Sequence, residues 1–318
     1  MGGSGFFCVE AVLGREIAFV GPVEFDIDLP EGAPVEGFPG DFEHPVLDSG
    51  GGGGWIPAVY EVGVSFLDPD SDDLLSCGGP GEKVFANEEF IEYADGEATT
   101  RLHLYRAFGE KRAFLKTVLE GGRIRMYIPD EAHWPPGRKR EIWAYLMLEK
   151  LLIKEGAVIL HSASVVYKGG AVLFTAPSGT GKSTQADLWK KYAGAIGFNG
   201  DRNILMEKDG LWVVCGLPWS GTSPEHLNEV HPLKAVAVVR RAKEDSVSEL
   251  SVTEKVLDIS EGLTMNHWDR EFMEKTFDIL MPLAEEALIV QLNCTMEKSA
   301  VECLKGYIEN GGGCDGAL

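Results

Sequence analysis

The sequence predicts a mixed α and β protein in two parts: an acidic, largely antiparallel β-rich region over residues 1–135, then an α/β region over 136–318. Two observations support this division. Residues 1–100 contain 21 acidic and two basic residues, whereas the rest of the chain contains 29 acidic and 27 basic residues. Apolar runs broken by glycine and proline dominate the first part, and strand patterns alternate with helical patterns in the second.

The composition excludes several other classes of protein. With 318 residues and 44% apolar content, the chain can bury a core, unlike a disordered or collagen-like chain. A net charge of -21 argues against nucleic-acid binding, which needs clustered positive charge. No apolar run reaches the ~18 residues of a membrane span, and no signal-peptide pattern is present, so we expect a cytoplasmic protein that binds no membrane. The six cysteines form no Cys-x-x-Cys pair and indicate neither a zinc knuckle nor a dithiol redox site.

The β-rich region is predicted from apolar runs between turn residues. Gly121 and Gly122 separate the last two runs and predict a hairpin. The runs span 16–20, 59–67, 102–108, 112–119 and 123–128.

The second region begins with apolar residues at helical spacing, which predict a helix over 138–154. Thr253 and Asp269 are expected to cap two later helices, which end near Leu263 and Ala284. Helices are also predicted over 183–192 and 297–308. The predicted strands are 157–160, 164–167, 171–175, 195–198, 204–206, 211–214, 234–239 and 288–292.

The strongest motif is a glycine-rich loop between the strand 171–175 and the helix that follows. From residue 176 to 184 it reads Ala-Pro-Ser-Gly-Thr-Gly-Lys-Ser-Thr. Glycines let backbone N–H groups curl around phosphate oxygens, lysine supplies positive charge, and the serine after it can bind Mg²⁺. The alternative is a glycine-rich turn without a ligand. The predicted cofactors are ATP and Mg²⁺, and the predicted binding residues are Ser178, Gly179, Thr180, Gly181, Lys182, Ser183 and Thr184.

Phosphate-loop enzymes also need an acidic residue near the phosphates. The later strands end in Arg240-Arg241 and in Asn293, whereas Asp201 follows the very next strand, nineteen residues after Lys182. Asp201 is therefore the predicted acid. The arginine pair either meets phosphate or acidic substrate, or is a solvated strand end.

A longer pattern surrounds the loop. His161-Ser162-Ala163-Ser164 precedes it, and Asn199-Gly200-Asp201-Arg202 closes the next strand. This pattern resembles the catalytic domain of HPr kinase/phosphorylase and its phosphoenolpyruvate carboxykinase-like superfamily, over about residues 155–300 and most closely over 161–202. Residues 216–222 resemble the second glycine loop of the shorter branch associated with peptide-modification clusters. The resemblance implies an HPr-kinase-like P-loop domain over 136–318.

The resemblance also implies roles for individual residues. Asp201 would be the general base and, with Ser183, a metal ligand; where the family usually has two adjacent acids, this chain has one. Arg202 would stabilise the transferred phosphoryl group, or pair with a neighbouring Glu. His161 would hydrogen-bond to a phosphate or to Asp201, or be a buried structural histidine. The predicted substrate loop, for which ordinary loop packing is the alternative, contains Trp219, Gly221 and Thr222.

The leading hypothesis is an ATP-dependent kinase that transfers the γ-phosphate to a hydroxyl group, namely a serine of a peptide or protein. One alternative is a kinase for a small metabolite such as a free amino acid. Another is a nucleotide-binding regulatory module without transfer activity. Phosphorylase activity is not assumed, and the resemblance also implies homo-oligomers.

Overall fold

The computed structural model describes residues 15–42, 57–67, 79–107, 109–220 and 225–310. It contains two large sheets and few helices, which confirms the mixed α and β class. The chain forms two units. Unit 1 comprises the described parts of residues 1–18, 24–44 and 57–146, and unit 2 comprises those of 19–23, 45–56 and 147–318.

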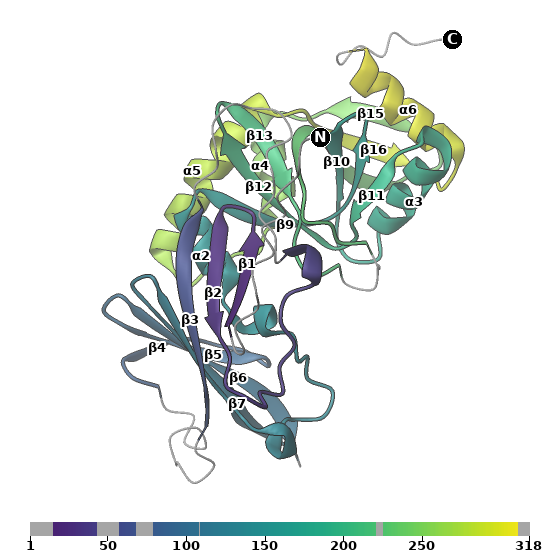
Figure 1. The fold of residues 1–318 in the computed structure, drawn as a ribbon. Helices are drawn as coiled ribbons and strands as arrows, with labels where there is room; N and C mark the ends of the chain where they lie inside the picture. Colours follow the sequence, from purple (N-terminus) through teal and green to yellow (C-terminus); the bar gives the residue numbers. More distant parts are fainter. Residues whose placement is uncertain (1–14, 43–56, 68–78, 108, 221–224, 311–318) are drawn as a thin grey trace, which may run out of the picture. The chain divides into compact units, whose positions relative to one another are not determined.

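The first sheet has eight strands (Figure 1). They are β1 (Arg15–Val20), β2 (Val23–Asp28), β3 (Ala58–Phe66), β4 (Glu82–Ala86), β5 (Phe90–Asp95), β6 (Ala98–Ala107), β7 (Glu110–Glu120) and β8 (Arg123–Ile128). Their order is β1-β2-β3-β8-β7-β6-β5-β4. The strands from β4 to β8 pair antiparallel in sequence, and β3 pairs in parallel with β8. The predicted hairpin is confirmed, and Gly121 in its turn has a φ of 58°.

The predicted helix over 138–154 is wrong in its first half. Ile142–Tyr145 forms one short 3₁₀ turn, and the α-helix α2 spans only Leu148–Lys154. Between them Met147 adopts a left-handed backbone with a φ of 55°, which a continuous helix cannot contain. The apolar residues before this break are buried although they lie outside an α-helix. Their spacing in the sequence therefore resembled that of a buried helix face without forming one.

Unit 2 is built on a second sheet whose long strands pair with different partners along their lengths. The first half of β9 pairs with β12 and its second half with β10, so the two strands predicted at 157–160 and 164–167 are one. The strands are β9 (Ala157–Tyr167), β10 (Gly170–Thr175), β11 (Ile196–Asn199), β12 (Arg202–Lys208), β13 (Leu211–Cys215), β14 (Val230–Arg241), β15 (Ser246–Glu249) and β16 (Ile289–Cys294).

Helices cover both faces of this sheet (Figure 1). They are α3 (Lys182–Ala193), α4 (Val252–Ser260), α5 (Arg270–Glu286) and α6 (Lys298–Glu309). Side chains alternate along β10: Val172 and Phe174 pack with residues of α3 and α6, whereas Ala171 and Leu173 pack with residues of α4 and α5. This alternation gives two apolar layers, one on each side of the sheet.

The helix caps explain two boundaries. Asp269 caps α5 as predicted, because its carboxylate accepts a hydrogen bond from the N–H of Phe272. The cap of α4 is Ser251 rather than the predicted Thr253. Ser251 and Glu254 each accept from the other's backbone N–H, a reciprocal capping box that fixes the start of the helix two residues earlier.

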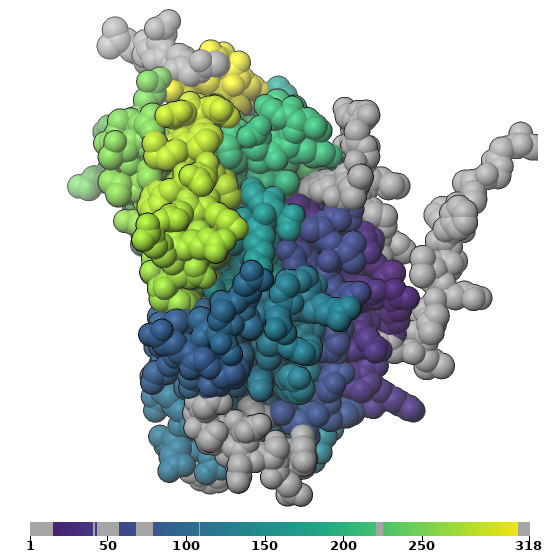
Figure 2. Space-filling model, turned by 90° about the vertical axis from the view of Figure 1, so that its left-hand side faces the viewer, coloured from purple at the N-terminus to yellow at the C-terminus, as the bar shows by residue number. Residues whose placement is uncertain are grey.

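The helix α5 runs in lime along the face of unit 2 shown in Figure 2. It carries exposed apolar side chains, including Phe277 and Met281. Within the described ranges, no helix has both the length and the apolar character needed to cross a bilayer.

Candidate functional site

Three parallel strands of unit 2 end at the same edge of the sheet. β10 pairs with β14 and β14 with β16, all in the same direction. The chain leaves β10 at Thr175 directly into the predicted phosphate loop, and β14 ends nearby at Arg240 and Arg241. Ligands of α/β sheets bind outside the carboxyl ends of such strands, so this edge is where the predicted loop needs to lie.

The loop has a backbone that needs its glycines. Gly179 has a φ of 76° and Gly181 a φ of 124°, values that side chains with a Cβ rarely adopt. The helix α3 starts immediately afterwards at Lys182 and has no side-chain N-cap. The strand, loop and helix therefore follow one another as the motif predicts.

The carbonyl groups of the loop nearly all accept hydrogen bonds from the protein. Because these bonds fix the peptide dipoles, the loop has one well-defined orientation. The donors are Lys182 Nζ for Ala176 (2.9 Å), the N–H of Thr180 for Pro177 (3.3 Å), Arg241 for Gly179 and Thr180 (3.0 Å from Nε to the latter), and the N–H of Gln185 for Gly181 (3.0 Å).

The backbone N–H groups of the loop contrast with its carbonyls. In the part of the chain that the structure describes, nothing accepts a hydrogen bond from the N–H of Ser178, of Gly179 or of residues 181–184. These donors gather at the positive end of the α3 dipole. Such an arrangement is suited to an anion with several oxygen atoms.

Lys182 lies in the loop as a largely buried cation. Its side chain is only 8% exposed, and burial lowers the pKa of its ammonium group. The negative charge of Asp201 opposes this shift. The loop therefore holds a poorly hydrated positive charge, which an anionic ligand would stabilise.

Strand pairing brings His161 and Asp201 together. In the register of β9 with β12, Arg202 lies opposite His161, and the N–H of Ser162 donates to the carbonyl of Asp201 at 2.9 Å. His161 Nε2 lies 3.4 Å from Asp201 Oδ1. β10 pairs with the other half of β9, and Thr175 Oγ1 donates to the carbonyl of His161 at 3.1 Å. His161 thus connects the base of the loop to the predicted acid.

Asp201 is an ionised, engaged carboxylate. The hydrogen bond from His161 lowers its pKa most, burial opposes the shift, and Arg202 lowers it further. Arg202 Nε lies 3.3 Å from Asp201 Oδ2, and Arg202 Nη1 donates to Thr264 Oγ1 at 2.8 Å. Among the described residues, Arg202 therefore contacts Asp201 and Thr264, and it does not pair with a neighbouring Glu.

Asn199 organises the turn that contains Asp201, a role the sequence analysis did not assign. Its side chain is fully buried. Oδ1 accepts from the N–H groups of Asp201 (3.0 Å) and Arg202 (3.1 Å), and Nδ2 donates to the carbonyls of Leu217 and Trp219, both at 3.0 Å. An Asn two residues before an Asp, with Gly between them, is typical of an Asx turn, and this signal was present in the sequence.

The predicted substrate loop is only partly described. Trp219 is half-buried, and its carbonyl is held by Asn199 as above. Gly221 and Thr222 lie outside the described residues. The predicted role of this loop stays a prediction.

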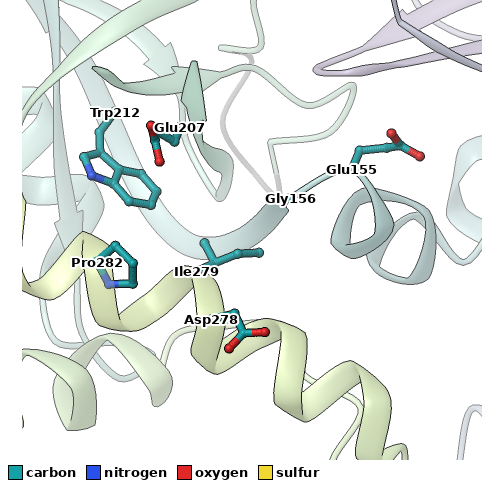
Figure 3. A pocket seen from close by; sticks show the side chains of 7 residues that line it. All are labelled: Glu155, Gly156, Glu207, Trp212, Asp278, Ile279 and Pro282. Carbon is teal, nitrogen blue, oxygen red and sulfur yellow. The ribbon is translucent and has the colours of Figure 1, made fainter. Parts of the chain in front are cut away.

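A separate hollow lies elsewhere in unit 2 (Figure 3). Its volume is about 380 Å³, and it contains none of the predicted site residues. Trp212 borders this hollow and also packs against the apolar core of the unit, and its indole N–H donates to Glu286 at 2.9 Å. The lining residues are Glu155, Gly156, Glu207, Trp212, Asp278, Ile279 and Pro282.

Comparisons with known proteins give distant similarities to solved structures. No family model matches the sequence, and no curated protein does. Among solved structures, the chain is similar to the Hpr(Ser) kinase/phosphatase from Coxiella burnetii, with 14% identity and a TM-score of 0.23. The match covers 29% of this chain and 64% of the other, less than two thirds of its length.

Proposed function

We propose that this chain is a kinase that binds ATP through residues 178–184 and transfers the γ-phosphate to a hydroxyl group, namely a serine of a peptide or protein. One observation carries the nucleotide part of the proposal. The loop has several backbone N–H groups without a described acceptor, whereas its carbonyls are occupied. Such donors occur at every helix N-terminus, but here they follow a loop whose glycines, with φ of 76° at Gly179 and 124° at Gly181, let the N–H groups curl around an anion.

The transfer step assigns roles to three side chains. The bond between the γ-phosphorus and its bridging oxygen breaks, a bond from the acceptor oxygen to that phosphorus forms, and ADP leaves. Asp201 takes the hydroxyl proton, because strand pairing places it beside His161 at the base of the loop and its charge acts on Lys182. Lys182 stabilises the negative charge of the phosphates, and His161 orients Asp201 through their contact.

Two side chains of the site also carry oxygen atoms that suit Mg²⁺. The side chain of Ser183 is exposed, and its hydroxyl has no hydrogen-bond partner among the described residues. Mg²⁺ prefers oxygen ligands and is usually held by one or two protein groups together with substrate phosphates. Ser183 and Asp201 are the groups that would hold it, and the ion would neutralise charge that otherwise repels the acceptor.

A second candidate is a nucleotide-binding regulatory module without transfer activity. It is favoured by one observation: both carboxylate oxygens of Asp201 are already engaged, Oδ1 by His161 and Oδ2 by Arg202. These contacts lower the pKa of Asp201 and so make it a weaker base. The two candidates share the loop and differ in whether phosphate leaves the nucleotide.

The test follows labelled γ-phosphate from ATP, with Mg²⁺, onto serine-containing peptides and onto free serine. We expect the wild type to label a peptide, Lys182→Ala to lose nucleotide binding, and Asp201→Asn to bind ATP while transfer falls about 100-fold or more. Lys298→Ala, which removes an exposed lysine of unit 2, is the matched control and should behave as wild type.

The other outcomes separate the candidates. Labelling of free serine alone identifies a metabolite kinase. Binding that requires Lys182, with no transfer to any acceptor and no change in Asp201→Asn, supports the regulatory module. A wild type that binds no ATP overturns both.

A further inference from the structure

Arg241 contacts the phosphate loop from a neighbouring strand. It is the last residue of β14, which runs parallel to β10 with Thr175 opposite Val238. Its Nε donates to the carbonyl of Thr180 at 3.0 Å, and its Nη2 donates to the carbonyl of Gly179. Two N–H groups of one planar guanidinium thus hold two successive carbonyls of the loop.

By holding two carbonyls, these contacts also fix the direction of the N–H group in each of the same peptide planes. A carbonyl and the N–H of the next residue lie in one plane and point in opposite directions. Holding the Thr180 carbonyl therefore orients the N–H of Gly181, which has no acceptor among the described residues. Holding the Gly179 carbonyl orients the N–H of Thr180, which closes the turn onto Pro177 at 3.3 Å.

The loop needs such a constraint because of its glycines. Gly179 and Gly181 flank Thr180, and glycine populates both signs of φ at little energetic cost. Without an outside contact, the freedom of these two glycines would let the peptide groups on either side of Thr180 rotate away from the orientation that points an N–H at the ligand. A guanidinium anchored on a strand removes that freedom before a ligand arrives.

Arg241 and its neighbour Arg240 differ in whether their positive charge is paired with a carboxylate. Arg240 forms an ion pair with Asp258, whereas Arg241 forms none with any carboxylate in the described ranges. Its positive charge therefore lies beside the loop without a neutralising partner. Backbone orientation and charge act in the same direction, toward an anion.

We propose that Arg241 is a positioning residue of the nucleotide site: it orients the loop N–H groups for a polyphosphate and does so through backbone carbonyls rather than through the ligand. This inference rests on the proposed function and adds a residue that the phosphate-loop motif does not contain. Because it acts on the phosphates, its effect should depend on the number of phosphates in the ligand.

The test compares binding of ATP, ADP and adenosine by wild type, Arg241→Gln and Arg241→Lys, with Arg240→Gln as the matched control. We expect Arg241→Gln to weaken ATP and ADP binding about tenfold and to leave adenosine binding unchanged. Arg241→Lys keeps the charge but loses the planar fork, so most of the loss should remain. In ¹⁵N spectra, the Gly181 amide resonance should move in both Arg241 variants and stay in Arg240→Gln.

The outcomes separate this inference from the proposed function. If Lys182→Ala loses ATP binding while Arg241→Gln binds ATP as wild type does, Arg241 has no positioning role and the function stands. If Arg241→Lys restores binding fully, charge alone is responsible and the orientation argument is wrong. Equal losses for adenosine and ATP would indicate general damage to the fold and overturn the inference. If the wild type binds no nucleotide, both fail.

Discussion

Polar side chains buried in unit 1 and backbone N–H groups in the glycine-rich loop of unit 2 differ in whether the protein itself supplies their hydrogen-bond partners. In unit 1, buried Arg101 donates to buried Glu92 at 2.7 Å, and the Thr117 hydroxyl lies 3.4 Å from the ring of buried His103. In unit 2, the backbone N–H groups of residues 178–184 are mostly without a described acceptor. Buried polar groups that satisfy one another stabilise a fold, whereas N–H groups at a helix N-terminus stay available to an anion, which is the role we propose for this loop.

We expect the largest effect on stability when the buried ion pair of unit 1 is broken. Arg101→Ala removes a cation that donates to the carboxylate of Glu92, a side chain only 1% exposed, and should lower the free energy of unfolding by about 3–5 kcal/mol. Arg123→Ala, which breaks an exposed pair with Glu61 in the same unit, should cost about 0–1 kcal/mol. Urea unfolding followed by circular dichroism measures both. Equal effects would mean that the buried pair has no special structural role.

A smaller stability effect, but a larger functional one, is expected at the phosphate loop. Gly181→Ala forces a side chain into a backbone with a φ of 124°, which should cost about 1–3 kcal/mol and abolish ATP binding, because the N–H groups no longer converge. The control is Gly122→Ala in the hairpin of unit 1, where the Cβ meets nothing within 4 Å and φ is not positive. Its unfolding free energy should change by less than about 0.5 kcal/mol. Retained ATP binding in Gly181→Ala would contradict the assignment of the loop.

The third effect depends on pH and belongs to unit 1. Burial, with the charges of Arg101 and Arg138, lowers the pKa of His103 well below 6.5. Above about pH 6.5 neither the folded nor the unfolded state binds the proton. As the pH falls below 6.5, the unfolded state binds it first, so stability decreases by up to about 1.4 kcal/mol per pH unit until the pH reaches the folded pKa.

His103→Gln should remove this dependence, and urea unfolding between pH 5 and 7 measures it. The readout is the difference in slope between wild type and variant, because other groups titrate in both. Identical slopes in the two proteins would show that folding does not lower the pKa of His103.

The local features of the fold were predictable from sequence, and the long-range ones were not. The strands at 102–108, 112–119 and 123–128 and the loop with its helix α3 have strong local patterns, and the structure contains them. The strand β15 was missed because it is a four-residue, mostly exposed edge strand with no alternation of buried residues. Exposure also hides β4, whose five residues include no buried one.

The candidate site divides in the same way. Gly179, Gly181 and Lys182 could be proposed from the sequence because the motif is continuous. The contacts of Arg241 with the loop bridge about sixty residues, and only the pairing of β10 with β14 creates them. The contact between His161 and Asp201 depends likewise on the register of β9 with β12, although the resemblance had suggested it.

The most direct test of the account is a calorimetric titration of wild type, Lys182→Ala and Lys298→Ala with a non-hydrolysable ATP analogue and Mg²⁺. We expect saturable binding at one site per chain in wild type and Lys298→Ala, and binding at least tenfold weaker in Lys182→Ala, a difference of about 1.4 kcal/mol or more. No binding by the wild type, or equal affinities in all three proteins, would contradict the claim that the loop at residues 178–184 is a nucleotide site.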